Sequence, residues 1–224
     1  MILTPSPHLA DLIFDEATHT YTYQGREIPS VTRIIREVGM SSFGNPTGTT
    51  RPMQIGKWIH EMLRLDLSNK LDESTLSPIM KMILNDVRAW AKRIDLKSLV
   101  LETPLVHSLY RFSGTPDLIG LAEEKLTIFD WKWGEPRPSD LVQLAGYWLL
   151  ALNCYEDLPR PGQIMPVYLK ALSRGQDPKA IHGQDFIESI SMFSSAQMIY
   201  RWKEKHRMLT VSRTDEHEEM EEIT

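Results

Sequence analysis

Residues 114–132 read GTPDLIGLAEEKLTIFDWK, a stretch in which two short apolar runs surround a pair of acidic residues. Apolar runs of this length, bounded by turn residues and rich in Leu, Ile and Phe, are typical of β-strands. We therefore expect strands at 117–121 and 126–131. A tight turn at Glu123-Glu124 would join them as an antiparallel pair.

Two aspartates lie at the same end of this expected pair, because Asp117 begins the first strand and Asp130 lies near the end of the second. Neighbouring carboxylates repel each other unless a cation lies between them, and hard oxygen ligands select Mg²⁺ or Mn²⁺. Lys132 follows Asp130 by two residues and so shares its face of the strand. Its ammonium group could orient a water molecule or stabilise charge on a phosphoryl oxygen. The carbonyl of Trp131, between them, is a further candidate ligand.

The pattern on either side of this stretch predicts an α/β protein with a mixed central β-sheet flanked by helices. The expected elements are a hairpin-like segment over 12–28, a short helix capped by Ser30, a loop over 40–53, helices over 55–67 and 75–94, the strand cluster, a helix over 138–153, a strand within 161–172 and an amphipathic helix over 188–206. Helical spacing places Trp58, Ile79 and Met82 on the apolar faces of the two earlier helices.

The composition excludes several classes of protein. The chain has 224 residues, of which 42% are hydrophobic and 25% charged, and a single cysteine. One cysteine excludes an internal disulfide framework and a cysteine-rich zinc module, and it fits a reducing compartment. No signal peptide is recognisable, and no apolar run reaches the about 18 residues of a membrane span. We therefore expect a cytoplasmic protein without a membrane partner.

The net charge of −5 would by itself argue against a nucleic-acid partner. The last residues, RTDEHEEMEEIT over 213–224, hold six acids and one arginine and so account for the whole excess. A block of like charge without apolar periodicity predicts a flexible acidic tail over 210–224. We expect a single domain over 1–209, with a hairpin and helices over about 12–95 and a core over about 98–207.

Four short motifs of the sequence resemble those of the PD-(D/E)XK nuclease superfamily. Two of them, GTPD over 114–117 and DWK over 130–132, are similar to the motifs that define the superfamily. Gln143 and Tyr147 are similar to the QxxxY extension of its RecB-like branch, and Gly56 and His60 to the histidine motif of that branch. The PSVT segment over 29–32 is similar to phage-type recombination exonucleases and to the mitochondrial genome maintenance exonuclease. The resemblance implies a restriction-endonuclease-like core with N-terminal helical additions.

The resemblance also implies a metal-dependent DNA exonuclease, in which water attacks a phosphodiester in line and leaves a 5′-phosphate. The implied cofactor is one or two Mg²⁺ or Mn²⁺ ions, and the implied partners are DNA ends and a single-strand annealing protein. The implied site consists of Asp117, Asp130, His60 and the carbonyl of Trp131 as metal ligands, Glu102 as a secondary candidate ligand, Lys132 as the catalytic group on the attacking water, and Gln143, Tyr147 and Trp133 as residues that shape the site or contact DNA.

Several alternatives stay open from the sequence. The same fold supports endonucleases, RNA-directed nucleases and DNA-binding or assembly proteins of weak activity. Gln143 and Tyr147 could be a plain packing pair at helical spacing, and Glu102 could form a salt bridge at the sheet edge. Family members often carry a small hydroxyl residue at the position of Trp133, which here could stack on a base or cap the sheet. Near the end of the last expected helix lies a basic cluster that could contact phosphate or simply be solvated: Arg201, Lys203, Lys205 and Arg207.

Overall fold

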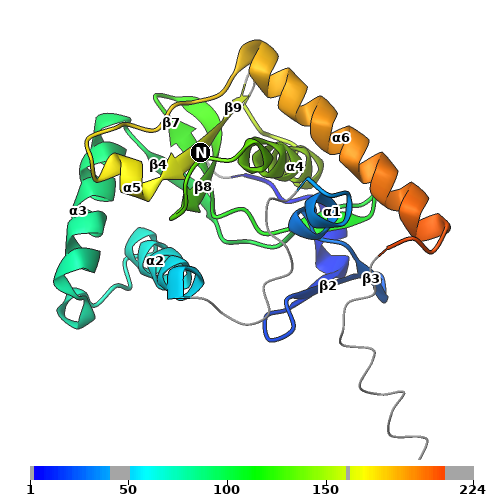
Figure 1. Cartoon of the computed structure of the whole chain (residues 1–224), viewed down its shortest axis with the longest axis horizontal. Helices are drawn as coiled ribbons and strands as arrows, with labels where there is room; N and C mark the ends of the chain where they lie inside the picture. Colours follow the sequence, from blue (N-terminus) through cyan, green and yellow to red (C-terminus); the bar gives the residue numbers. More distant parts are fainter. Residues whose placement is uncertain (1–2, 41–50, 160–161, 210–224) are drawn as a thin grey trace, which may run out of the picture.

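The computed structural model describes residues 3–40, 51–159 and 162–209 (Figure 1). The acidic tail predicted over 210–224 lies outside the described residues, as does most of the loop predicted over 40–53. The flexibility predicted for these two segments therefore stays a prediction.

A four-stranded mixed sheet forms the centre of the fold, as the sequence predicts. Its strands, in spatial order, are β4 (Lys97–Leu101), β7 (Leu118–Ala122), β8 (Lys125–Lys132) and β9 (Gly162–Tyr168). The first three pair antiparallel, whereas β8 and β9 pair parallel. A parallel pair needs a long crossover. Helix α4 (Pro138–Cys154) forms the crossover between β8 and β9.

The turn between β7 and β8 is as tight as predicted. Leu118 pairs with Phe129, and the pairing continues to the last residue before the turn. Glu123 and Glu124 both have positive φ angles, 50° and 65°, which is the geometry of a two-residue turn that follows the natural twist of a hairpin. The antiparallel pair predicted from 117–121 and 126–131 is therefore confirmed.

Two layers of helices cover the sheet (Figure 1). One face is covered by α1 (Val31–Glu37), α4 (Pro138–Cys154) and α6 (Gly183–Lys205). The other face is covered by α2 (Arg51–Leu67), α3 (Pro78–Arg93) and α5 (Leu169–Leu172). The α/β class with helices on both sides of a mixed sheet is thus confirmed.

Strand β8 shows how the sheet serves both layers. Leu126 and Ile128 pack in the cluster that contains α4, whereas Phe129 and Trp131 pack in the cluster that contains α2 and α3. This alternation follows from the two-residue period of a strand. Seven of the eight residues of β8 are buried or half-buried, as expected of a strand that is covered on both faces.

The N-terminal segment forms a three-stranded meander rather than a simple hairpin. A short 3₁₀ turn (Pro7–Asp11) precedes its strands β1 (Leu12–Asp15), β2 (Thr20–Tyr23) and β3 (Arg26–Ile28). Beside them, β5 (Leu105–His107) pairs with β6 (Phe112–Gly114). A second 3₁₀ turn lies between α2 and α3, at Glu73–Thr75. Ser30 caps α1 as predicted, since its hydroxyl accepts the Arg33 amide. Residues of α1 share a core with α4 and α6, so the N-terminal part packs on the rest of the chain.

The apolar faces predicted for α2 and α3 are partly wrong. Trp58 is 63% exposed, and Ile79 and Met82 are 58% and 51% exposed. Helices of an outer layer can bury only the stripe that faces the sheet. In α3 that stripe consists of Ile83, Leu84, Val87 and Trp90.

The last helix is also less amphipathic than predicted, and it begins at Gly183 rather than near 188. Its buried face carries Phe193 and Tyr200, but Met198 and Trp202 are exposed on the outside. Apolar residues therefore lie on both sides of α6, and the periodicity of one buried face is weak. None of the helices in the described part of the chain is long and apolar enough to cross a bilayer.

Helix α4 lies so close to β9 that the strand has no room for a side chain at Gly162. A Cβ atom there would lie 1.8 Å from Cη2 of Trp148. We expect Gly162→Ala to lower the free energy of unfolding by about 1–3 kcal/mol, the usual cost of overpacking, in urea titrations. Gly134→Ala, where a Cβ meets open space, should stay within about 0.5 kcal/mol of the parent. Equal losses in both variants would contradict the packing argument.

His107, at the end of β5, is held in its neutral form. Its ring packs against Tyr110 and Phe112, and its Nδ1 accepts the backbone N–H of Tyr110 at 3.3 Å. Burial, followed by the positive charges of His8 and Arg201, lowers the pKa of His107 from 6.5 to about 4. The stability that this neutral histidine contributes is present above pH 6.5 and is lost as the pH falls through about 4.

We therefore expect His107→Gln to reduce the pH dependence of stability. The free energy of unfolding of the parent should fall between pH 7 and pH 5 by more than that of the variant, because glutamine does not titrate. Urea titrations at the two pH values measure the difference. The same fall in parent and variant would show that His107 does not control it.

Candidate functional site

The pairing of β7 with β8 places the two predicted aspartates side by side. Leu118 pairs with Phe129, so Asp117 and Asp130 occupy the next position of the same antiparallel register. Both carboxylates are buried, with exposed fractions of 9% and 3% for the whole residues. The predicted meeting of the two carboxylates at one end of the strand pair is confirmed.

A cluster of three possible ligands forms around Asp117. His60 approaches from α2, and its Nδ1 lies 3.2 Å from Oδ1 of Asp117. Glu102 follows β4 directly and lies opposite Asp117, because its N–H donates to the carbonyl of Asp117. One ligand atom from each of these three residues lies within 4.8 Å of the other two. Glu102 thus belongs to the cluster, but its carboxylate also lies 3.7 Å from Nε of Arg64, so the salt-bridge alternative is present too and its role as a ligand stays a prediction.

Trp131 reaches the site through its backbone. Its N–H donates to Oδ2 of Asp117 at 2.7 Å, which fixes the carboxylate relative to β8. Its indole ring points away, into the core beside Trp90 and Phe129. The role of its carbonyl as a metal ligand stays a prediction.

Lys132 is held between Asp130 and Gln143. Its Nζ lies 2.5 Å from Oδ2 of Asp130 and donates to Oε1 of Gln143 at 2.9 Å. The amide nitrogen of Gln143 in turn donates to the Tyr147 hydroxyl at 2.9 Å and to Oδ1 of Asp130 at 3.4 Å. The predicted common face of Asp130 and Lys132 is confirmed, and the Gln143–Tyr147 pair lies in the site rather than only packing on the sheet.

The two oxygens of Asp130 have different partners. Oδ2 lies 2.5 Å from Nζ of Lys132 in an ion pair, and Oδ1 accepts from the amide of Gln143 at 3.4 Å. A carboxylate offers about four lone-pair sites, so a divalent cation could bind Asp130 beside these partners.

The charges of the site are strongly coupled. Burial raises the pKa of Asp130, and the neighbouring Asp117 raises it further. Burial, and then the charge of Asp117, raise the pKa of Glu102 to about 7. Burial lowers the pKa of His60, but the charge and hydrogen bond of Asp117 outweigh it and bring the value to about 9. Asp117, Asp130 and Glu102 therefore share the positive charges of His60, Lys132 and Arg64.

The donor set fits a divalent metal ion. Carboxylate oxygens are the ligands that Mg²⁺ and Mn²⁺ prefer, and imidazole is accepted by Mn²⁺ and its neighbours. His60, Glu102 and Asp117 supply one nitrogen and two carboxylates whose ligand atoms lie within 4.8 Å of one another, and Asp130 is the neighbouring buried carboxylate, paired with Lys132. The first three are the residues that would hold the ion, and the role of Asp130 as a further ligand stays a prediction.

Three further residues support the site and were not predicted to do so. Asp140, near the start of α4, lies 4.0 Å from Nζ of Lys132 and accepts the Tyr168 hydroxyl at 2.9 Å. Gly114 leaves room for Tyr147, because a Cβ there would lie 2.8 Å from its ring. Asp140 had a visible signal, an acid at a helix start, but that signal is equally typical of a cap.

Trp133 packs away from the hydrogen-bond network of Lys132 and Gln143. It is half-buried against the cluster under α2 and α3, and Nζ of Lys170 lies 5.1 Å from the centre of its ring. The structure therefore favours the alternative in which this tryptophan covers the sheet edge. Stacking on a base stays a prediction for its exposed part.

No protein-family model matches the chain, and no curated protein matches its sequence. The motifs that resemble the PD-(D/E)XK nucleases are only a few residues long each. They are nevertheless the segments that meet at the end of β7 and β8. The function is therefore inferred from the residues of this site.

Mn²⁺ or Mg²⁺ should stabilise the folded protein if the cluster binds metal. A ligand that binds only the folded state at 100 times its Kd contributes about 2.7 kcal/mol, which raises Tm in thermal unfolding. We expect Asp117→Asn to abolish this shift and Glu102→Gln to reduce it. Glu73→Gln is the matched control, because Glu73 is an exposed glutamate that pairs with Arg88 at the surface. A full shift in Asp117→Asn would exclude this cluster as the metal site.

Proposed function

We propose that this protein is a metal-dependent nuclease that hydrolyses phosphodiester bonds of DNA and acts at DNA ends. The observation that carries the proposal is the meeting of Asp117, Asp130 and Lys132 with Gln143 at one end of the sheet, next to His60. The mixed sheet with helices on both faces is compatible with a restriction-endonuclease-like core, which we propose as the finer description of the fold.

Four residues would hold Mg²⁺ or Mn²⁺ in this mechanism: His60, Glu102, Asp117 and Asp130. When bound, such an ion polarises a phosphoryl oxygen and lowers the pKa of a water molecule. The N–H of Trp131 keeps Asp117 in place for this role. The buried position of the carboxylates excludes competing water and strengthens every charge interaction in the site.

Lys132 is the residue suited to act on the reacting groups. Two of the three N–H donors of its ammonium group are directed at Asp130 and Gln143, which leaves one for a water molecule or a phosphate oxygen. The charge of Asp130 raises the pKa of Lys132 against the opposite effect of burial, so the side chain is a cation. A fixed cation next to a pentacoordinate phosphorus stabilises the charge that develops there.

Gln143 and Tyr147 position that lysine. The amide of Gln143 contacts Lys132 through its oxygen and Tyr147 through its nitrogen, so its orientation is fixed from both ends. Burial holds the pKa of Tyr147 well above its ordinary value, and its hydroxyl stays protonated. The pair therefore acts as a neutral brace between α4 and β8.

We expect Lys132→Ala to lower the rate of DNA cleavage by about 10²–10³-fold or more, the usual effect of removing one preorganised donor to the transition state. DNA binding by the variant should remain, because the metal ligands are intact. Gel assays of linear DNA with Mg²⁺ and fluorescence anisotropy without cleavage measure the two effects.

Lys125→Ala is the matched control, since Lys125 is an exposed lysine at the other end of the same strand. It should cleave like the parent. Because Lys132→Ala leaves Asp130 buried without its partner, urea unfolding must show that the variant is folded. Retained cleavage by folded Lys132→Ala would contradict the assigned role.

The choice between ends and internal bonds is tested with two forms of one plasmid. The proposed exonuclease degrades the linear form and leaves the covalently closed circle intact. Nicking of the circle would make the protein an endonuclease on the same fold. Absence of cleavage on every DNA and on matched RNA, with DNA binding retained, would favour a binding or assembly protein.

A further inference from the structure

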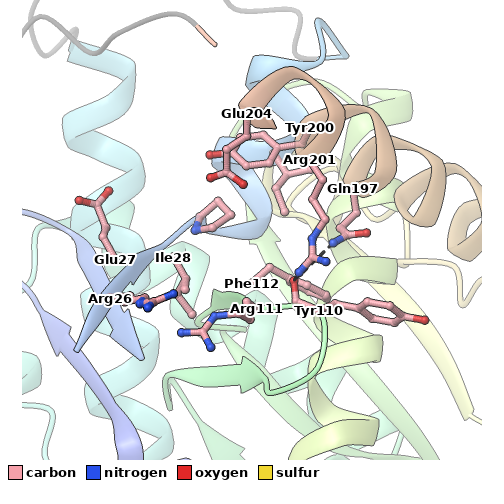
Figure 2. A pocket seen from close by; sticks show the side chains of 12 residues that line it. Arg26, Glu27, Ile28, Tyr110, Arg111, Phe112, Gln197, Tyr200, Arg201 and Glu204 are labelled. Atoms are coloured by element: carbon pink, nitrogen blue, oxygen red, sulfur yellow. Dashed lines mark hydrogen bonds between the residues drawn. The ribbon is translucent and has the colours of Figure 1, made fainter. Parts of the chain in front are cut away.

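A second pocket lies away from the metal cluster, between the N-terminal meander and the last helix (Figure 2). Its volume is about 330 Å³. Strand β3, the turn between β5 and β6, and the C-terminal half of α6 form its walls. The residues that matter for its chemistry are Arg26, Glu27, Tyr110, Arg111, Arg201 and Glu204.

Three arginines from three separate elements face this pocket. Figure 2 shows Arg26 and Arg111 side by side, and Arg201 reaching down from α6 toward Tyr110. Nη2 of Arg111 donates to the carbonyl of Tyr23 at 3.2 Å, and its guanidinium lies over the Tyr23 ring. Arg201 donates to the carbonyl of Tyr110. Neutral acceptors thus orient two of the guanidinium groups without cancelling their charge.

The carboxylates of the pocket do not neutralise these arginines. Glu27 is paired with Arg33, whose Nη1 lies 2.6 Å from it. In Figure 2 the carboxylate of Glu27 points away from Arg26, and Glu204 lies above Arg201 on α6. Within the described part of the chain, none of the three arginines has a carboxylate within 4.0 Å, the limit for a salt bridge.

One other observation agrees with a positive charge here. Burial is the main cause of the low pKa of His107, and the charges of His8 and Arg201 lower it further.

We propose that this pocket binds a phosphate group of a nucleic-acid strand, at a distance from the bond that is cleaved. Arginine presents five N–H donors in a planar fork that matches phosphate oxygens. Arg111 and Arg201 each use one donor on a backbone carbonyl, which leaves the others for a ligand. The aromatic ring of Tyr110 at the wall offers a surface for a base or sugar next to that phosphate.

The chain itself limits the distance between this pocket and the metal cluster. Phe112 lines the pocket, and Asp117 follows it by five residues. An extended chain spans at most about 3.6 Å per residue, so their Cα atoms lie within about 18 Å of each other. At about 3.4 Å per nucleotide along a B-form strand, this is about five nucleotides. A strand longer than this would have the length needed to span the two places.

The inference rests on the proposed nuclease function and assigns a substrate contact to it. The test compares the double variant Arg26→Gln/Arg201→Gln with Arg174→Gln/Lys179→Gln, which removes the same charge from an exposed loop before α6. Arg26→Gln alone is a further variant, because the Arg26 side chain is exposed and its loss leaves the fold unchanged. Two substrates are used, a DNA strand of about 15 nucleotides and the small diester bis(p-nitrophenyl) phosphate.

We expect the pocket variant to raise the KM for the long strand by about 10-fold, the effect of one lost hydrogen bond to a charged group, with kcat unchanged. Hydrolysis of the small diester should stay the same, because it cannot reach the pocket. The slope of log K for DNA binding against log salt, measured in the Lys132→Ala background, should decrease by about one unit. The control pair should change neither quantity.

Unchanged KM and salt slope in the pocket variant, with cleavage by the parent intact, would overturn the pocket assignment and leave the proposed function standing. If the parent cleaves no DNA and the pocket variant binds DNA more weakly than the parent, the pocket assignment stands and the proposed nuclease function is wrong. Inorganic phosphate is the probe for a free ligand. If it raises the Tm of the parent but not of the pocket variant, while both bind DNA equally, the ligand is a free phosphate and the nucleic-acid assignment is wrong.

Discussion

The burial of two like charges at the end of one strand pair constrains the rest of the site. Asp117 and Asp130 lie at one register position of β7 and β8, and burial makes their mutual repulsion strong. The protein offsets it with the Trp131 N–H on one carboxylate and the Lys132 ammonium group on the other. His60 and Gln143 add one contact to each carboxylate. Taking these charges out of water still costs free energy, and a divalent cation would lower that cost.

Strand β8 connects the chemistry to the core. Its odd-numbered residues Phe129 and Trp131 anchor it beneath α2 and α3, while Asp130 and Lys132 turn toward α4. The same two-residue alternation that builds the core therefore sets the positions of the charged groups. His60 comes from the opposite helical layer and meets Asp117 at the strand end. The site thus lies where both layers reach the edge of the sheet, and rigid elements rather than loops hold most of its side chains.

The parts of the site that depend on local spacing could be predicted from the sequence, whereas those that depend on packing could not. Asp130 and Lys132 are two apart on a strand, and strand periodicity alone places them together. The inclusion of Glu102 in the ligand cluster depends on the pairing of β4 with β7, whose register shifts between Ser98 and Val100. A shift of one residue turns a side chain to the other face, so sequence reasoning had no means to choose between a site acid and a surface salt bridge. The contact of Asp140 with Tyr168 likewise joins elements that no short-range pattern relates.

The distribution of charge explains why the net charge is a poor guide to the partner. The acidic excess lies in the last residues, and the remainder of the chain is formally neutral, yet it holds the carboxylates of the metal cluster apart from the arginines of the pocket. In the proposed nuclease a phosphate strand would be attracted at the pocket and would meet the carboxylates of Asp117 and Glu102 at the cluster. A bound cation would turn the local charge in favour of phosphate. The metal would therefore help the strand to lie across the site as well as serve the hydrolysis. The arginine pocket would hold the strand by contacts that do not depend on the metal.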